Sequence, residues 1–456
     1  MEPVTFIIAA IASIGIWRST PLYGLCIYFA AMLLYPAFLT LKIGPVDFNV
    51  GRILILVLYA KLILQTTVLQ QFRWTILDKM VVVVFVTKTL ALFTNAPVQP
   101  VLEHESGVVV TVLLPYIAIR AIITTKQDFF ILVQTLIGVG LVLAVLGAYE
   151  SLTGNNPMGF MKSYDAWQPR EHRMINRLGL HRADVSFGNY LAFGLYFAAM
   201  LPLSLMLRGN QVKLLSKLFV ASLLLVGAIS SMSSAPLFAI AFSGAFLFFF
   251  PFRMFAPLLI VMTVIVCVFL EFYSNRHFYE VPSRLALDQA TVYDRVGLYE
   301  EAFGGGMSGH WITGYGYVGL GPGQKYNDDF DWQHIDLLNI YINRLVQAGL
   351  VGTIPFLIMN VMYYVYLRRA FVACRTFEDQ WMVWCLTATL LGWNLAMQTV
   401  GFLGNLESLL FSWIALAGCM PAIIARQAVE PESHTPVTVS PEPYRGVRSP
   451  ETVNQL

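Results

Sequence analysis

Long apolar stretches alternate with short polar turns along most of this chain, and two longer polar stretches interrupt the alternation. A helix that crosses the hydrocarbon core of a bilayer needs about 20 predominantly apolar residues. By that criterion the sequence predicts an all-α polytopic transmembrane helical bundle of 12 or 13 spans, because the first segment is short enough to be re-entrant or interfacial instead. The segments are 4–17, 20–40, 50–68, 79–96, 106–124, 127–149, 187–207, 213–231, 233–250, 255–273, 346–367, 379–400 and 406–425.

Basic residues gather in five of the short turns, and Lys and Arg in short loops favour the cytoplasmic side of a membrane. The five turns alternate correctly along the chain, so all can lie inside. Segments 97–105, 150–185 and 274–338 are then external, and 1–426 form one transmembrane domain. From 427 to 456 the composition is rich in Pro, Glu, Val and Ser, which predicts a disordered cytoplasmic tail. The basic turns hold Arg73 and Lys79; Arg120 and Lys126; Arg208, Lys213 and Lys217; Arg253; and Arg368, Arg369 and Arg375.

Composition agrees with a membrane protein, since 57% of the residues are hydrophobic and only 12% are charged, against about 25% charged in soluble domains. A net charge of +2 gives no indication of a nucleic-acid partner. Five cysteines stand singly, without the spacing of a zinc site or a disulfide framework. The apolar start of the chain follows Glu2 and no basic residue, so a cleavable signal peptide is not expected.

Few ionisable residues fall inside the predicted spans, and Lys61 and Lys88 are the clearest. Charged groups at membrane depth often mark substrate or ion pathways. Alternatively, such lysines extend to the interface or pair with a backbone carbonyl. The sequence alone leaves both interpretations open.

The first long loop places five arginines and histidines within eleven residues, and Arg177 and Arg182 lie in this cluster. Arginine matches phosphate oxygens with two parallel hydrogen bonds, so the cluster suits a diphosphate head group at the outer membrane surface. The other interpretation is a solvated basic loop that touches anionic lipid.

The second long loop and the helix that follows combine aromatic rings with carboxylates and amides, a mixture suited to carbohydrate. The candidate glycan-binding residues are Trp311, Tyr315, Trp332, Asn339 and Tyr341. His334 precedes the helix that enters the next predicted span. A histidine there can act as a general base near neutral pH, although a single histidine is more often structural.

Three short motifs resemble the O-antigen ligase and O-antigen polymerase superfamily of bacterial membrane proteins. Asn339-x-Tyr341 is followed by Ala348-Gly349-Leu-Val-Gly352; Arg295 precedes Gly314-Tyr-Gly316; and Arg177-Leu-Gly179 leads into Ser186-Phe-Gly-Asn189-Tyr. The motifs cover roughly residues 175–355, and the layout of spans and loops is similar over the whole chain. Family members often carry His directly before the Asn, where this chain has Leu338, and Ser-Arg-Gly in a span, where it has Ser233-Ser234-Ala235.

The resemblance implies a glycosyltransferase of the bacterial cytoplasmic (inner) membrane, acting on its outer face in lipopolysaccharide or exopolysaccharide biosynthesis. The donor would be an undecaprenyl-diphosphate-linked glycan and the acceptor a glycan or lipid, with no cofactor and no metal. Carried over, Arg177 or Arg182 and Arg295 hold the diphosphate, and His334 activates the acceptor hydroxyl. Ligase and polymerase both stay open. The alternative function is a transporter or flippase of lipid-linked or small anionic substrates, and a structural or sensor role is third.

Overall fold

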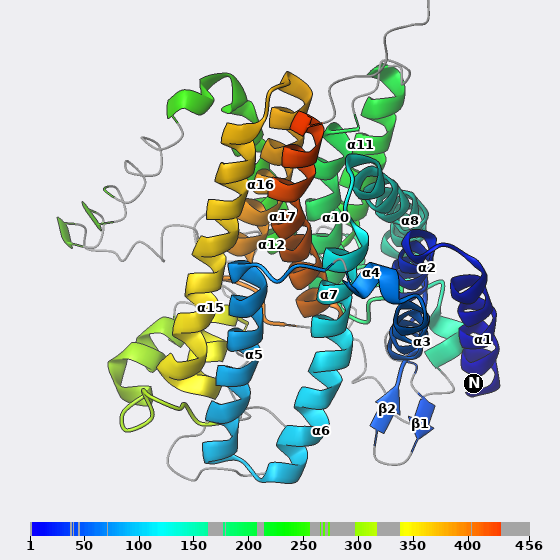
Figure 1. Ribbon diagram of the computed structural model, residues 1–456. Coiled ribbons are helices and arrows are strands. Elements are labelled where there is room, and N and C mark those ends of the chain that lie inside the picture. Colours follow the sequence, from blue (N-terminus) through cyan, green and yellow to red (C-terminus); the bar gives the residue numbers. More distant parts are fainter. Residues whose placement is uncertain are drawn as a thin grey trace, which may run out of the picture.

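In a computed structural model of the chain, the described residues are 2–36, 39, 41–43, 46–70, 72–162, 177, 179–207, 214–255, 265, 268–269, 272–273, 297–316, 338–402 and 404–429. They form a helical bundle with one short hairpin of two strands (Figure 1). The helices are α1 (Glu2–Arg18), α2 (Pro21–Leu34), α3 (Val50–Leu64), α4 (Thr66–Gln70), α5 (Ile76–Asn95), α6 (Val98–Val108), α7 (Leu114–Ile122), α8 (Lys126–Thr153), α9 (Gly159–Lys162), α10 (Tyr190–Leu205), α11 (Leu214–Ser230), α12 (Ser234–Phe248), α15 (Ile340–Ala373), α16 (Phe377–Ala396) and α17 (Leu406–Val429).

Three shorter helical turns and the hairpin are the other elements whose bounds the structure gives. A π-helical turn, η1 (Val109–Leu113), joins α6 to α7, so these three run on without a loop. The strands β1 (Leu41–Ile43) and β2 (Val46–Phe48) pair antiparallel between α2 and α3. The remaining turns are η2 (Phe250–Phe255) and η4 (Ala302–Gly306).

Polar residues at the turns set the starts of several helices. Thr75 and Asp78 form a reciprocal cap at the start of α5, and Thr125 and Asp128 form the same cap at the start of α8. Such a cap satisfies backbone N–H groups that the first helical turn leaves without partners. Between the caps the segments are apolar, and so the sequence specifies both where these helices begin and what they bury.

Among the described residues, four helical segments are long and apolar enough to cross a membrane: Val98–Ile122, Lys126–Thr153, Ile340–Ala373 and Leu406–Arg426. In the same part of the chain, five further apolar helices are shorter, between 10 and 17 residues. These helices pack into one bundle, with α1, α2 and α3 on one side and α5 and α15 on the other (Figure 1). The prediction of a polytopic helical bundle is supported at this level.

Several predicted boundaries differ from the structure. The predicted external segment 97–105 is helical, because α6 begins at Val98. Helix α16 ends at Ala396, short of the predicted 400, and α17 continues to Val429, past the predicted start of the tail at 427. The second long loop is described only over 297–316 and at its end, and the predicted span 255–273 lies almost wholly outside the described residues.

Contacts between distant segments define one end of the bundle, here called the loop end. Backbone N–H groups of Asp184 and Val185 donate to Glu150 at the last turn of α8 (3.1 and 2.8 Å). The Ser186 hydroxyl donates to Leu33 O at the end of α2 (2.5 Å). The second long loop joins the same end, where the amide of Asn95, the last residue of α5, donates to the backbone carbonyl of Gly314 (2.9 Å).

The opposite end, here called the basic end, holds the short basic turns that precede α8 and α16. Lys126 Nζ lies 2.5 Å from Asp379 Oδ1, which joins the start of α8 to the start of α16. Arg426 Nη1 donates to Thr124 O (3.1 Å), which fixes the end of α17 beside the same turn. These contacts bring the basic turns 120–126 and 368–375 to one end of the bundle.

Helix α15 is broken at Gly349, where the backbone has φ 58° and ψ −160°. In a continuous helix Tyr341 and Phe356 would be separated by about 22 Å, at 1.5 Å per residue. Their ring centroids are instead 6.0 Å apart, so the chain reverses at Gly349. Residues 340–348 therefore form a short helix that lies back against the longer part of α15. This corrects the prediction of one helix running from His334 straight into the span 346–367.

Candidate functional site

A cavity of about 310 Å³ lies between the starts of α3 and α17, the second halves of α5 and α6, the η1 turn, and the short reversed part of α15. Its walls are dominated by cationic and amide side chains. The lining residues are Asn49, Arg52, Lys88, His104, Val108, Thr111, Val112, Ile340, Asn343, Arg344, Gln347, Phe402, Gly404, Asn405, Glu407 and Ser408.

Arg344 is the most informative of these residues. Its side chain comes from the reversed part of α15, and the residue is only 5% exposed. Nη1 and Nη2 are buried without a hydrogen-bond partner among the described residues. The guanidinium carbon lies 4.6 Å from the centre of the Phe356 ring, which holds the group in place. A buried charge is costly unless it is paired, so this arrangement is that of a binding group for an anion.

Lys88 and Glu105 form a buried ion pair beside Arg344. Lys88 Nζ lies 3.0 Å from Glu105 Oε1, and His104 Nδ1 lies 3.0 Å from the same oxygen. Both charged residues are more than nine-tenths buried. The Thr89 hydroxyl also donates to Glu105 (3.3 Å). Among the described lining residues, the cations Arg52, Lys88 and Arg344 outnumber the one carboxylate, Glu407.

Arg52 enters the cavity from the first turn of α3. The cap of that helix is Asn49, whose side-chain oxygen accepts from the backbone N–H of Arg52 (2.8 Å). On the facing helix, a Cβ at Gly107 would lie 2.9 Å from Arg52 Nη2, so glycine provides the room for the guanidinium. The π-helical turn η1 follows directly and contributes Thr111 and Val112 to the wall. Such turns occur often at functional sites.

Glu407, in the first turn of α17, is the carboxylate among the described lining residues. Its Oε1 is buried and has no hydrogen-bond partner among the described residues. The charges of Glu407 and Glu105 both act on Arg344. An unpaired acceptor and an unpaired donor thus border the same cavity.

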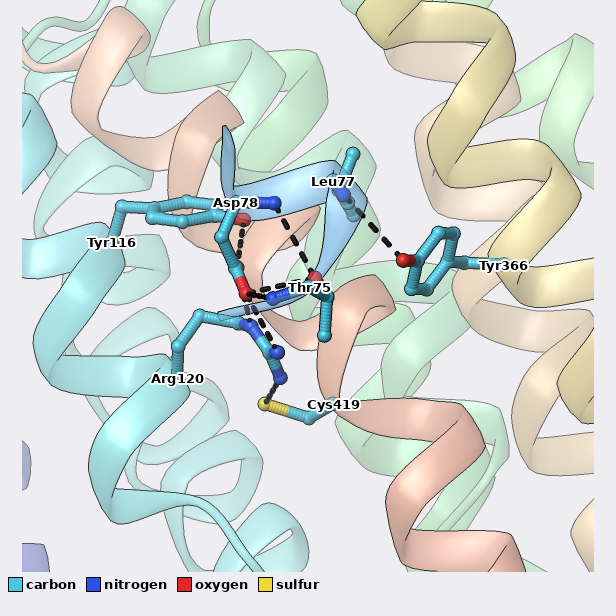
Figure 2. Close-up of polar contacts among 7 residues, drawn as sticks. All are labelled: Thr75, Leu77, Asp78, Tyr116, Arg120, Tyr366 and Cys419. Carbon is cyan, nitrogen blue, oxygen red and sulfur yellow. Dashed lines mark hydrogen bonds and ion pairs between the residues drawn. The ribbon is translucent and has the colours of Figure 1, made fainter. Parts of the chain in front are cut away.

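A second buried arginine shows what a fully paired group looks like in this protein (Figure 2). Arg120 Nε and Nη2 donate to the two oxygens of Asp78 at 2.8 and 3.1 Å. Tyr116 and Thr75 also donate to Asp78, and Arg120 Nη1 lies 3.5 Å from Cys419 Sγ. This cluster joins α5, α7 and α17 at the basic end. Its carboxylate is saturated, so the cluster is a structural tie.

The two described loop arginines lie apart from the cavity lining. Arg177 exchanges backbone hydrogen bonds with Leu180 in a tight turn (3.0 Å each). Arg182 stacks on Tyr190, with its guanidinium carbon 4.3 Å from the ring centre. The loop is nevertheless attached to the same end of α2 as the cavity, because Asn405 donates to Met32 O (3.4 Å) beside the Ser186 contact with Leu33.

Tyr315, Asn339 and Tyr341 lie near the reversed helix but are engaged in packing. The Tyr315 hydroxyl donates to Gly306 O (2.6 Å), and Asn339 caps residues 340–348 while donating to Tyr299 (2.7 Å). Tyr341 donates to Asn394 (3.2 Å). Trp311 is 37% exposed, and its backbone carbonyl accepts from Leu350 (2.8 Å). In the described part of the chain none of these four lines the cavity.

Arg295, His334 and Trp332 lie outside the described residues. Of the two intramembrane lysines, Lys61 donates to the backbone carbonyls of Ile16 and Ser19 at the end of α1, the structural alternative foreseen from the sequence. Lys88 lines the cavity.

The sequence interpretation did not single out Arg52, His104, Glu105, Arg344 or Glu407. Arg52 and Glu407 stand at the edges of predicted spans and could have been found as ionisable residues close to membrane depth. Arg344 lies only three residues after Tyr341 of the family-like motif.

Comparisons with protein-family models and with curated protein sequences give no match. The resemblance to the O-antigen ligase and polymerase superfamily therefore stands as a prediction from short motifs. Among the described residues, no group of three or more His, Cys, Asp or Glu side chains could hold a metal ion.

Proposed function

We propose that this protein transfers a glycan from a polyprenyl-diphosphate carrier to a glycan or lipid acceptor, at the outer side of a bacterial cytoplasmic membrane. The observation that carries the proposal is the buried guanidinium of Arg344, whose Nη atoms face a cationic cavity without hydrogen-bond partners among the described residues. A cavity of about 310 Å³ is at the lower limit of ordinary ligand sites.

In this reaction the diphosphate leaves the anomeric carbon as negative charge develops on its bridging oxygen. Cationic donors placed where that charge appears lower the barrier most in a site that excludes water. Arg344, Arg52 and Lys88 are such donors, and Arg344 offers the planar pair of N–H groups that matches two phosphate oxygens. The cavity lies at the loop end, which is external in the orientation predicted from the basic turns.

The proposal is tested with purified protein in lipid nanodiscs, using radiolabelled undecaprenyl diphosphate as the binding probe. Wild-type protein is expected to bind the probe, and Arg344→Lys to bind it much more weakly, because an ammonium group cannot form the planar pair of hydrogen bonds. Glu103→Gln, an exposed change on α6 outside the cavity lining, is the matched control. No binding by wild-type protein would contradict the proposal.

Surface glycans of a strain lacking the protein separate the two forms of the reaction. Loss of all long chains from the acceptor indicates a ligase, and acceptors with single repeats indicate a polymerase. Unchanged glycans would contradict both.

A transporter or flippase of anionic substrates is the second candidate, and the buried Lys88–Glu105 pair favours it. Charged residues at membrane depth often line substrate pathways. Lys88 lines the cavity with Arg344, and Glu105 is its ion-pair partner. The test is movement of a fluorescent undecaprenyl-diphosphate glycan between the leaflets of proteoliposomes. Movement without glycan transfer would support this candidate, and transfer without movement would exclude it.

A further inference from the structure

Two unpaired groups of opposite charge face the cavity from different helices. Arg344 comes from the reversed part of α15 and Glu407 from the first turn of α17. Neither the Nη atoms of Arg344 nor Oε1 of Glu407 has a hydrogen-bond partner among the described residues, although the charge of Glu407 acts on Arg344. The lining of one cavity therefore offers a strong donor and a strong acceptor to a bound ligand.

We infer that Glu407 is the general base of the glycosyl transfer proposed above, and the inference rests on that function. A single displacement needs the acceptor hydroxyl on one side of the anomeric carbon and the leaving diphosphate on the other. A substrate with its diphosphate at Arg344 would present the opposite side of its first sugar to another wall of the cavity. Glu407 is the carboxylate whose Oε1 is unpaired there.

The step balances without any further reactant. The acceptor oxygen forms a bond to the anomeric carbon as its proton passes to the Glu407 carboxylate. The bond between the anomeric carbon and the bridging oxygen breaks, and its electron pair stays on the diphosphate, beside Arg344 and Arg52. The protonated Glu407 then releases its proton to water when the products leave.

Other titratable groups around the cavity are less suited to the task. Glu105 is engaged by Lys88 and His104, at 3.0 Å each. His104 Nδ1 is directed at Glu105, and its side chain is 49% exposed. Arg52, Lys88 and Arg344 carry no acceptor. Among the described cavity residues Glu407 is thus the one carboxylate with a buried oxygen that lacks a partner.

The test measures single-turnover transfer and undecaprenyl diphosphate binding separately, in nanodiscs, for wild type, Glu407→Gln and Glu407→Asp. Loss of a general base is expected to slow transfer by about 10²–10⁴-fold in Glu407→Gln. Probe binding should be unchanged or tighter, because a negative charge is removed near the bound anion. Glu407→Asp should recover part of the rate, because it restores a carboxylate at this position.

The outcomes distinguish a wrong assignment of Glu407 from a wrong proposed function. Transfer at the wild-type rate in Glu407→Gln would overturn the inference, while leaving the proposed function intact. Equal losses of transfer and probe binding would also overturn it, since Glu407 would then be structural. If wild-type protein neither binds the probe nor transfers glycan, the proposed function fails and the inference with it. Glu103→Gln, an exposed carboxylate change, should match wild type throughout.

Discussion

At the scale of single residues, two buried arginines differ in whether their guanidinium groups have partners, and so in how their removal should change the free energy of unfolding. Arg120 is saturated by Asp78, whereas the Nη atoms of Arg344 have no hydrogen-bond partner among the described residues (Figure 2 shows the former). Breaking a buried pair by removing one partner costs about 3–5 kcal/mol. Removing a cation that has no ion pair avoids that cost and relieves its desolvation.

We therefore predict that Arg120→Ala lowers the melting temperature in detergent sharply, because it leaves Asp78 buried and unpaired. Arg344→Leu should keep or raise the melting temperature while abolishing undecaprenyl diphosphate binding, since leucine preserves the packing on Phe356. Thermal unfolding of both variants beside wild type makes the comparison. A large loss of stability in Arg344→Leu would mean that Arg344 is a structural residue.

The sequence was only partly informative at this scale. Lys88 could be recognised as a charge inside an apolar stretch, and it does line the cavity. Arg344 and Glu407 stand near the ends of apolar segments, where charges are ordinary, so only the folding of α15 and α17 shows that they share a cavity. Local spacing equally favoured Asn339 and Tyr341 as ligand-binding groups, but their side chains are committed to a cap and to Asn394.

At the scale of elements, the reversal of α15 creates the cavity wall that carries Arg344. Gly349 has φ 58°, and a Cβ there would lie 2.3 Å from Ile312 O and 2.6 Å from Gly314 N. Both the backbone conformation and the close approach therefore require glycine. One continuous apolar helix and two shorter helices that fold back on each other have the same pattern of apolar residues. This is why the sequence predicted an uninterrupted helix here.

We predict that Gly349→Ala destabilises the protein by more than the roughly 1–3 kcal/mol expected for backbone strain alone, because the methyl group also meets backbone atoms of 312–314. Undecaprenyl diphosphate binding should fall with it as Arg344 is displaced. Gly138→Ala in α8 is the control, since nothing lies within 4 Å of its added Cβ and alanine favours a helix. A Gly349→Ala protein with wild-type melting temperature and binding would refute the role given to the reversal.

At the scale of the whole molecule, the placement of functional groups follows the two ends of the bundle. The cavity and the described parts of both long loops lie at the loop end, and the Lys126–Asp379 and Arg120–Asp78 pairs lie at the basic end. The alternation of basic turns predicts that long loops and short turns occupy opposite ends, because each short turn returns the chain to the same side. The pattern of basic turns could not predict the helix at 98–108 or the reversal at Gly349, since neither changes which end of the bundle a turn occupies.

We predict that the loop end faces outward from the cytoplasmic membrane. Ser308→Cys, exposed at the loop end, should react with a membrane-impermeant maleimide on intact cells whose outer membrane, if present, has been permeabilised. Gln127→Cys, exposed at the basic end, should react only after the cytoplasmic membrane is opened. Background labelling should be low because Cys26, Cys374, Cys385 and Cys419 are buried, and wild-type protein measures what remains. The reverse pattern would place the cavity in the cytoplasm, where an externally presented polyprenyl-diphosphate glycan is out of reach, and would contradict the proposed function directly.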